Sequence, residues 1–433
     1  MRIRISLLLA VLFFFSSIYS QELDNEMNEL MNTNDYLKLK RRYETAKDSM
    51  QIVPLKLMIE LFQNAAFNKL DKSNANAREL LENHQESLGL HGIAAVVFAL
   101  SDNHKRQGNF QTSSEVVKPF LDYVLTLEGG PDLDMIVKNL KNRLPMGVFG
   151  NGFKPVIVRP DRDCEISYHD GDGKLENLMY VDANLNGNDV SFVFDTGADG
   201  FDTNTVSEGF ARRNGIRILG DSVVITGTAD GSVRLGIADS MQIGDITYKN
   251  VGFTVAPGDN LLPVDTLFLE AILGSVFMKA MGEFQIYPKE KKIVFPKDES
   301  PMPAGGSNMF FQTGQPYVEA FSKDERLLLH FDTGGGVALS SKYYLEHKDE
   351  VEATGRLYTE GGVGGFGAMI RMDQYILPVF PLRIGDKEKE FKEVRIMTDI
   401  DNLNLGDGGI GADFVRRFDK VTVNYNKMFV KFE

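Results

Sequence analysis

The residues of this chain with the clearest chemical potential are two aspartates in the same short motif. Asp195 and Asp332 each follow a phenylalanine and open an Asp-Thr-Gly triplet, 137 positions apart (332 − 195). Two carboxyl groups held about 3 Å apart cannot both ionise cheaply, so they share a proton and their apparent pKa values split. The charged member can then deprotonate a water molecule while the neutral member donates a proton. The pair therefore predicts acid–base hydrolysis.

Each aspartate follows an apolar stretch that is typical of a buried β-strand. Val190 to Phe194 precedes Asp195, and Leu327 to Phe331 precedes Asp332. The glycine of each triplet permits a tight turn, so the carboxylate is presented at the end of its strand. We therefore expect the ends of two strands to bring the aspartates together.

The two triplets belong to a longer internal repeat with a constant offset. The offset of 137 also relates three further pairs: Tyr180 and Tyr317, Gly274 and Gly411, and Phe295 and Phe432. Matches that stay in register while the intervening sequence diverges indicate a tandem duplication of a β domain. The predicted copies cover residues 156–297 and 305–433, separated by a Pro- and Gly-rich break.

The chain before the repeat has a different composition. Residues 22–142 contain little Gly or Pro, and apolar residues such as Leu55, Met58 and Leu61 recur three and four positions apart, as in amphipathic helices. Polar turns near Tyr36, Asn74 and Phe110 suggest a repeat that resembles degenerate tetratricopeptide units. An irregular helical bundle is the alternative. Either arrangement predicts an all-α domain at residues 21–145.

Residues 1–20 are typical of a secretory signal peptide. Arg2 and Arg4 precede an apolar run from Leu7 to Phe15, and Ser20 offers a small residue for cleavage. Nine apolar residues cannot span about 30 Å of hydrocarbon. The expected mature protein is soluble, without a membrane span, and periplasmic or extracellular.

Composition excludes several classes of function. The net charge of 47 − 61 = −14 makes the chain a poor polyanion binder, so no nucleic-acid partner is expected. There is one cysteine, and the six histidines never fall at a paired-ligand spacing. Neither a metal nor another cofactor is expected. The run of residues 362–367 matches Gly-x-Gly-x-x-Gly, but a strand is expected to follow it rather than the helix of a dinucleotide site.

With both motifs in place, residues 156–433 resemble aspartic peptidases of the pepsin and retropepsin fold. Phe194-Asp195-Thr196-Gly197-Ala198-Asp199 is similar to the retroviral motif. Ile272-Leu273-Gly274 and Gly409-Ile410-Gly411 occupy the place of the apolar-apolar-Gly element of each lobe. The resemblance implies a multidomain fold, in which an all-α domain precedes two all-β lobes that form a bilobal acid-protease unit. A monomer would suffice to assemble the pair.

The resemblance also implies roles for individual residues. The catalytic pair would be Asp195 and Asp332. Its supporting residues would be Thr196, Gly197, Thr333 and Gly334. Substrate-binding positions would be Asp199 and the glycines of two flap hairpins, Gly227, Gly231, Gly362 and Gly364. Ala198 and Gly335 depart from the Ser or Thr of pepsins.

Three functional hypotheses follow. The first is a secreted aspartic endopeptidase that acts on polypeptides, with a helical domain that docks a protein partner. The second is an inactive peptide-binding or envelope scaffold protein that retains the peptidase fold. A third possibility makes residues 21–150 an autoinhibitory prosegment. Two intact Asp-Thr-Gly motifs favour the first, since a binder has no chemical need for converging carboxylates.

Overall fold

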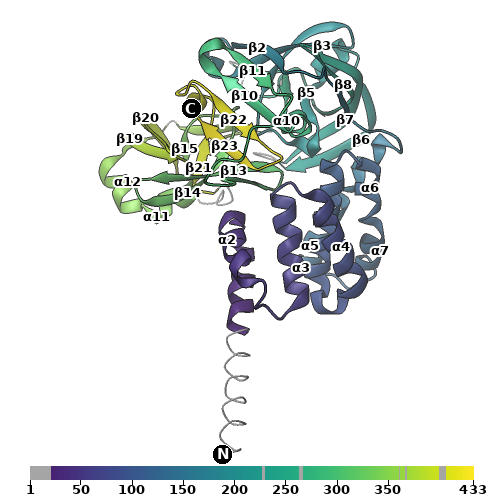
Figure 1. Cartoon of the computed structure of the whole chain (residues 1–433). Coiled ribbons are helices and arrows are strands. Elements are labelled where there is room, and N and C mark those ends of the chain that lie inside the picture. Colours follow the sequence, from purple (N-terminus) through teal and green to yellow (C-terminus); the bar gives the residue numbers. More distant parts are fainter. Residues whose placement is uncertain (1–20, 227–229, 263–266, 360, 366–367, 399–405) are drawn as a thin grey trace, which may run out of the picture.

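The structure is a computed structural model, and it describes residues 21–226, 230–262, 267–359, 361–365, 368–398 and 406–433. The expected signal sequence and Gly227 of the first flap lie outside the described residues. Within the described part of the chain, no helix is both long and apolar enough to cross a membrane. The chain forms an N-terminal helical region followed by a largely β region (Figure 1).

The helical region contains these described helices: α2 (Tyr36–Ala46), α3 (Val53–Ala66), α4 (Leu70–Asn83), α5 (Gln85–Arg106), α6 (Phe110–Glu115), α7 (Lys118–Val124) and α8 (Pro131–Lys141). Local sequence features explain where several of these helices begin. The Asp35 side chain accepts a hydrogen bond from Lys38 N and caps α2. Proline stands in the first turn of α3, α7 and α8, where its missing N–H has no cost.

The prediction of a turn at Ser73-Asn74-Ala75 is wrong, because these residues lie inside α4. Their polar side chains are buried and bond to neighbouring helices instead of their own backbone. Ser73 Oγ donates to Leu61 O at 2.8 Å, and Asn103 Nδ2 donates to Asn74 Oδ1 at 2.9 Å. Polarity at this point of the sequence therefore marks an interhelical contact rather than a turn.

The first half of the β region runs from residue 156 to residue 297. Its strands are β1 (Val156–Val158), β2 (Cys164–Asp170), β3 (Met179–Leu185), β4 (Asn188–Phe194), β5 (Asn204–Ser207), β6 (Arg217–Thr226), β7 (Asp230–Ile243), β8 (Ile246–Ala256), β9 (Ala271–Leu273), β10 (Glu283–Tyr287) and β11 (Lys292–Phe295). Helices α9 (Glu208–Arg213) and α10 (Ser275–Met281) lie between them.

The second half runs from residue 305 to residue 433. Its strands are β12 (Met309–Gln312), β13 (Gln315–Ser322), β14 (Glu325–Phe331), β15 (Ala338–Leu339), β16 (Arg356–Tyr358), β17 (Gly362–Gly365), β18 (Ala368–Arg371), β19 (Gln374–Ile384), β20 (Lys387–Met397), β21 (Gly408–Ile410), β22 (Val421–Asn424) and β23 (Phe429–Phe432). Its helices are α11 (Ser341–Glu346), α12 (Lys348–Thr354) and α13 (Ala412–Val415).

The strand that precedes each aspartate has the same neighbours in the two halves. β4 pairs antiparallel with β3 and parallel with β9. β14 pairs antiparallel with β13 and parallel with β21. The halves are also joined to each other, because β22 of the second half pairs antiparallel with β10 of the first. Both motif strands are therefore held on two sides before the chain turns at the aspartate.

The helical region packs against both halves of the β region (Figure 1). Leu37, Ala66 and Phe67 belong to the same hydrophobic core as the motif phenylalanines Phe194 and Phe331. Two arginine–carboxylate pairs fasten α2 to the second half. Arg41 forms a bidentate pair with Glu319, with both distances 2.7 Å, and Arg326 pairs with Asp35 at 2.6 and 3.0 Å.

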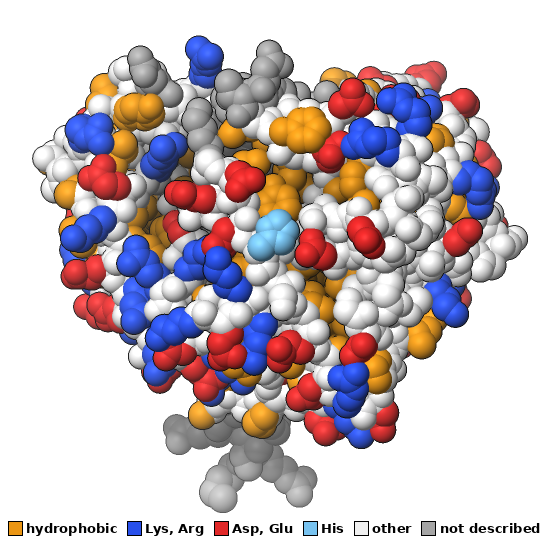
Figure 2. Space-filling view, turned by 90° about the horizontal axis from the view of Figure 1, so that it is seen from above, with side chains coloured by type: hydrophobic (Ala, Val, Ile, Leu, Met, Phe, Trp, Pro, Cys, Tyr) orange, Lys and Arg blue, Asp and Glu red, His pale blue; other side chains and the backbone are white. Residues whose placement is uncertain are grey.

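The face of the molecule seen in Figure 2 carries Lys and Arg side chains interspersed with Asp and Glu. Apolar side chains show between these charged groups.

Candidate active site

The two aspartates stand where β4 and β14 end. The backbone N–H of Asp195 donates to Leu273 O of β9 at 3.1 Å, and that of Asp332 donates to Ile410 O of β21 at 2.8 Å. The apolar-apolar-Gly elements expected behind the motifs therefore do lie beside them. Because parallel pairing fixes the end of each strand, the position of each carboxylate is set by the backbone rather than by a flexible loop.

The two motif threonines connect the halves through four hydrogen bonds. Thr196 N donates to Thr333 Oγ1 and Thr333 N donates to Thr196 Oγ1, both at 3.0 Å. Each hydroxyl also donates across the interface, Thr196 Oγ1 to Phe331 O at 2.8 Å and Thr333 Oγ1 to Phe194 O at 2.7 Å. Both threonines are fully buried. These bonds join the two motif loops directly to each other.

The motif glycines allow the carboxyl groups to approach. A Cβ on Gly197 would lie 2.4 Å from Asp332 Cγ, and a Cβ on Gly334 would lie 2.4 Å from Asp195 Oδ2. Each carboxyl group therefore packs against the glycine of the other motif. Each glycine N–H also donates to the aspartate of its own motif, Gly197 to Asp195 at 2.8 Å and Gly334 to Asp332 at 2.9 Å.

The surroundings of Asp195 favour its protonated form. Burial, followed by the charge of Asp332 and a hydrogen bond with it, raises the pKa of Asp195 well above its usual range. Hydrogen bonds from Gly197 N and Ala198 N act in the opposite direction. Both aspartates remain partly exposed. A neutral carboxyl group beside a second carboxyl group, in reach of water, can perform acid–base hydrolysis.

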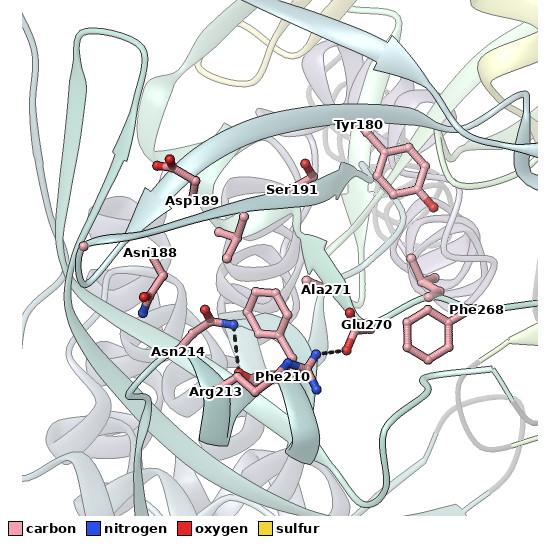
Figure 3. A pocket seen from close by; sticks show the side chains of 13 residues that line it. Tyr180, Asn188, Asp189, Ser191, Phe210, Arg213, Asn214, Phe268, Glu270 and Ala271 are labelled. Carbon is pink, nitrogen blue, oxygen red and sulfur yellow. Dashed lines mark hydrogen bonds and ion pairs between the residues drawn. The ribbon is translucent and has the colours of Figure 1, made fainter.

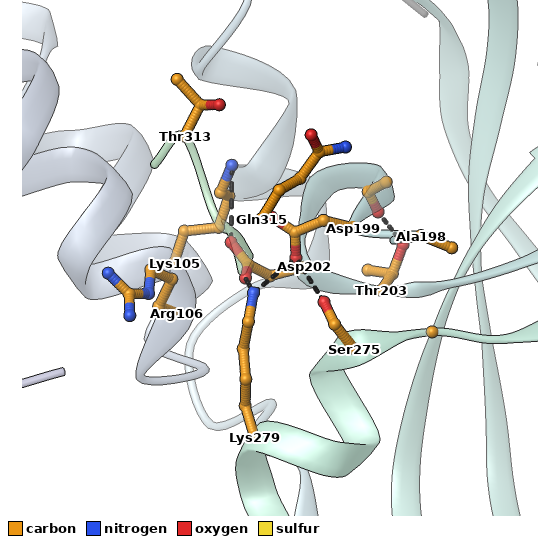
Figure 4. Close-up of polar contacts among 12 residues, drawn as sticks. Lys105, Arg106, Ala198, Asp199, Asp202, Thr203, Ser275, Lys279, Thr313 and Gln315 are labelled. Atoms are coloured by element: carbon orange, nitrogen blue, oxygen red, sulfur yellow. Dashed lines mark hydrogen bonds and ion pairs between the residues drawn. The ribbon is translucent and has the colours of Figure 1, made fainter. Parts of the chain in front are cut away.

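Asp199, which was predicted to bind substrate, forms an ion pair and a hydrogen bond with residues of α10. Its Oδ1 accepts from Lys279 Nζ at 2.7 Å and from Ser275 Oγ at 3.1 Å (Figure 4). Only 13% of its side chain is exposed. Ser275 N also donates to Ala198 O at 2.8 Å, so the start of α10 lies against this loop. Ser275 and Lys279 lie four positions apart on one helix face, but this spacing does not identify Asp199 as their partner.

Asp413 was missed by sequence reasoning. Its Oδ2 accepts from Val337 N at 3.0 Å, and a Cβ on Gly336 would lie 3.1 Å from the same oxygen. By the offset of 137, Gly336 corresponds to Asp199 and Asp413 to Val276. The second half thus holds its motif loop with a carboxylate on the helix, whereas the first half uses a carboxylate on the loop.

The remaining predicted residues lie in two hairpins. Gly231 pairs with Ile225 in the β6–β7 hairpin, while Gly227 is not described. Gly362 pairs with Arg371, and Gly364 with Met369, in the β17–β18 hairpin. The strand that was expected after Gly-x-Gly-x-x-Gly is confirmed, so this run is not the start of a helix. The structure brings together Asp195, Asp332 and their four supporting residues, but not Asp199.

A hollow of about 640 Å³ lies on the flank of the first half (Figure 3). Its lining comes from β3, β4, α9 and the segment before β9, and it includes neither aspartate of the pair. Arg213 and Glu270 form an ion pair inside it. Among the described residues, no group of three or more His, Cys, Asp or Glu side chains could hold a metal ion.

Comparison with known proteins finds a family model that matches a segment of the first half. Residues 181–280 match the model described as gag-polyprotein putative aspartyl protease. This match supports the resemblance to aspartic peptidases of the retropepsin and pepsin type that was inferred from the motifs. None of the curated proteins compared with the sequence matches it.

Solved structures with a similar arrangement include three that are distant in sequence. A retropepsin-like aspartic protease from Rickettsia conorii is 18% identical, with a TM-score of 0.22, and the match covers 34% of this chain and 95% of that one. Basic 7S globulin from soybean is 11% identical, with a TM-score of 0.40 and coverage of 63% and 95%. Conglutin gamma from lupine seeds is 9% identical, also at a TM-score of 0.40, with coverage of 63% and 95%.

Proposed function

We propose that this protein is a secreted aspartic endopeptidase, in which Asp195 and Asp332 activate a water molecule that hydrolyses a peptide bond. The observation that carries the proposal is the reciprocal packing of the pair. Each carboxyl group lies 2.4 Å from the position of a Cβ on the other motif's glycine, and the Thr196–Thr333 bonds hold this arrangement.

The mechanism follows from the shared proton. The ionised member of the pair takes a proton from water while the neutral member hydrogen-bonds the carbonyl oxygen of the peptide. Attack of the water oxygen on the carbonyl carbon gives a tetrahedral intermediate. The carboxyl group that gained the water proton then donates a proton to the leaving nitrogen, and the C–N bond breaks. The proton taken from water is given back to the leaving nitrogen, so the proposed steps require no metal ion.

The arrangement of the chain supports further parts of the proposal. Residues 156–297 and 305–433 form two lobes that arose by tandem duplication, since the motif strands share their pairings. The β6–β7 and β17–β18 hairpins act as flaps over a polypeptide substrate. The sequence of residues 1–20 supports export to the periplasm or the extracellular space. The chain acts as a monomer, and its helical domain docks a protein partner.

Cleavage of a peptide library between pH 3 and pH 7 tests the proposal. Wild-type protein is expected to cleave, whereas Asp195→Asn, Asp332→Asn and the double variant should each lose nearly all activity, because the pair acts as a unit. Asp161→Asn is the matched control, since its side chain is 89% exposed and distant in sequence from both motifs. A statine-type inhibitor, whose hydroxyl group mimics the attacking water, should bind only wild type and the control.

The alternative of a peptide-binding scaffold predicts a different result. Wild-type protein would then bind peptides from the library in calorimetry and release them uncut at every pH. Cleavage that persists in Asp195→Asn, or cleavage that a chelator abolishes, would also overturn the endopeptidase proposal. The raised pKa of Asp195, caused first by burial and then by Asp332, favours the enzyme, because a carboxyl group that only binds peptide gains nothing from a shared proton.

A further inference from the structure

The loop that follows the first aspartate motif has a strained backbone. Phe201 and Asp202 are consecutive residues with positive φ, 56° and 53°. This left-handed conformation costs a residue other than glycine free energy, and it persists where surrounding contacts hold it. Within the loop, Asp202 N donates to Asp199 O at 3.0 Å. Contacts from other parts of the chain therefore hold residues 198–203 in this conformation.

One set of contacts is apolar and comes from both the helical region and the first half. Phe201 packs against a buried cluster that contains Phe110 of α6, Met146 and Phe149 of the short 3₁₀ helix η1 (Leu144–Phe149), and Leu235 of β7. The Phe201 side chain thus lies where elements that precede the β region meet the β6–β7 hairpin. The strained turn is part of the boundary between the helical region and the first half.

The second set of contacts is ionic and is shown in Figure 4. Lys105, near the end of α5, lies with its Nζ 3.5 Å from Asp202 Oδ2. Lys279 of α10 lies 2.7 Å from Asp199 Oδ1 and 3.5 Å from Asp202 Oδ1. The Asp202 side chain is 3% exposed and that of Lys105 is 20% exposed. Without Lys105, the two buried carboxylates would keep Lys279 as their ion-pair partner, with the charge of Arg106 also acting on them. Loss of a paired cation is costly in a poorly solvated site.

Residues of the second half also contact the loop of residues 198–203 and the cations that pair with it. Gly314, in the turn between β12 and β13, is so close that a Cβ there would lie 1.8 Å from Asp199 Oδ2. Gln315 Nε2 donates to Gly197 O at 3.1 Å. Phe311 of β12 stacks beneath Lys279 at 5.0 Å and Arg106 at 4.8 Å. The loop is therefore held where the helical region and both β halves meet.

The loop is directly connected to the aspartate pair. Ala198 N donates to Asp195 Oδ1 at 3.1 Å, and Ala198 O accepts from Ser275 N at 2.8 Å. A displacement of residues 199–202 would move this N–H relative to the Asp195 carboxylate. The hydrogen bond stabilises the charged form of a carboxyl group, so its loss would alter how the pair shares its proton.

We propose that Lys105 is a positioning residue for the aspartate pair, acting through Asp202 and the loop of residues 198–203. The inference rests on the proposed peptidase function and assigns the helical domain a part in it. The helical domain supplies one of the cations, Lys105, and part of the apolar cluster that hold the loop, so it stays with the peptidase lobes in the active protein. This role differs from that of a removable prosegment.

The test compares Lys105→Met with Arg143→Met in the full chain. Arg143 is the control for the other carboxylate near Lys105. Its side chain is 19% exposed and pairs with Asp102 at 2.7 Å, and Lys105 Nζ lies 3.8 Å from the same carboxyl group. Equal effects of the two variants would therefore point to Asp102 rather than to Asp202. Two readouts are measured: kcat and KM on the library peptide that wild type cleaves best, and hydrogen exchange of peptides covering residues 195–203. We expect Lys105→Met to lower kcat by about tenfold or more with KM changed less than about twofold, as when an interaction made in the transition state is lost.

Exchange at residues 195–203 should speed up in Lys105→Met and stay at the wild-type rate in Arg143→Met. Lys105→Arg, which keeps the charge, should restore most of kcat. Asp202→Asn combined with Lys105→Met should recover part of the lost activity, because the uncompensated carboxylate is removed. Equal effects of Lys105→Met and Arg143→Met on kcat, or faster exchange without a fall in kcat, would overturn the proposal. If wild type cleaves nothing, the peptidase function fails, and unchanged exchange in Lys105→Met would separately refute the positioning contact.

Discussion

Thr196 and Thr333 hold the two aspartate motifs together by exchanging hydrogen bonds, each hydroxyl accepting from the other's N–H at 3.0 Å. Each hydroxyl also donates to a carbonyl oxygen of the opposite strand. The two β halves are thus joined at the point where the carboxyl groups meet. Since all six participating groups are main-chain or short side-chain atoms, little conformational freedom remains at this junction.

Replacing one of these threonines should destabilise the protein substantially. Thr196→Val removes a hydroxyl and leaves Thr333 N and Phe331 O buried without their partners, which costs about 1–3 kcal/mol for each group. The loss from Thr196→Val with Thr333→Val should be smaller than the sum of the two single losses, because the side chains share their bonds. Urea unfolding measures these free energies.

Thr354→Val is the control, because the Thr354 hydroxyl is exposed and bonds only within its own helix. It should change the unfolding free energy by less than about 0.5 kcal/mol. Strict additivity of Thr196→Val and Thr333→Val would contradict the reciprocal arrangement.

The close approach of each carboxyl group to the opposite glycine predicts a severe loss of activity in Gly334→Ala. The new Cβ would lie 2.4 Å from Asp195 Oδ2, so the carboxyl group must shift and the pair can no longer share a proton directly. A displacement of about 1 Å can cost on the order of 100-fold in rate. Peptide cleavage and statine-type inhibitor binding measure the effect. Gly305→Ala, whose Cβ would meet nothing within 4 Å, should behave as wild type.

The aspartate pair predicts a bell-shaped dependence of kcat on pH. Cleavage requires one charged and one neutral carboxyl group, so activity is lost when the pair is fully protonated and again when it is fully ionised. The raised pKa of Asp195, due first to burial and then to Asp332, moves the loss of the shared proton to higher pH. We expect an optimum at about pH 4–6. A rate that rises steadily up to pH 8 would contradict this arrangement.

Asp199 should make unfolding depend on pH. Burial and then the charge of Asp202 raise its pKa to about 6, against the charges of Lys279 and Lys105. A carboxyl group with a raised pKa binds its proton more tightly in the folded state, so its contribution to stability is present at low pH. That contribution is lost as the pH rises from about 4 to about 6.

Asp199→Asn should flatten this dependence. The free energy of unfolding in urea should fall by on the order of 2 kcal/mol more in wild type than in Asp199→Asn between pH 4 and pH 6, since one pKa unit corresponds to about 1.4 kcal/mol. Asp161→Asn serves as the exposed control and should keep the wild-type slope. If the free energy of unfolding changes equally with pH in all three proteins, the raised pKa of Asp199 is refuted.

The part of the site that could be predicted from the sequence is the part that depends on local pattern. An apolar strand that ends in Asp-Thr-Gly carries its own turn, and a second copy at a constant offset implies a matching strand end. These inferences need only strand periodicity and the repeat, both of which are present along the chain. The place of the Ile272-Leu273-Gly274 element beside Asp195 was implied by the resemblance to aspartic peptidases instead.

The partners of Asp199, Asp413 and Lys105 were decided by the tertiary structure. The residues of each pair lie about 75 to 100 positions apart (413 − 337, 279 − 199 and 202 − 105), so the contact depends on how separate elements pack. A carboxylate next to Asp-Thr-Gly is equally compatible with a solvated surface and with a buried ion pair. Only packing sets the cost of desolvating it and brings a lysine from another element to offset that cost. The motif therefore determined where the acids stand, and the surrounding fold determined which charges hold them there.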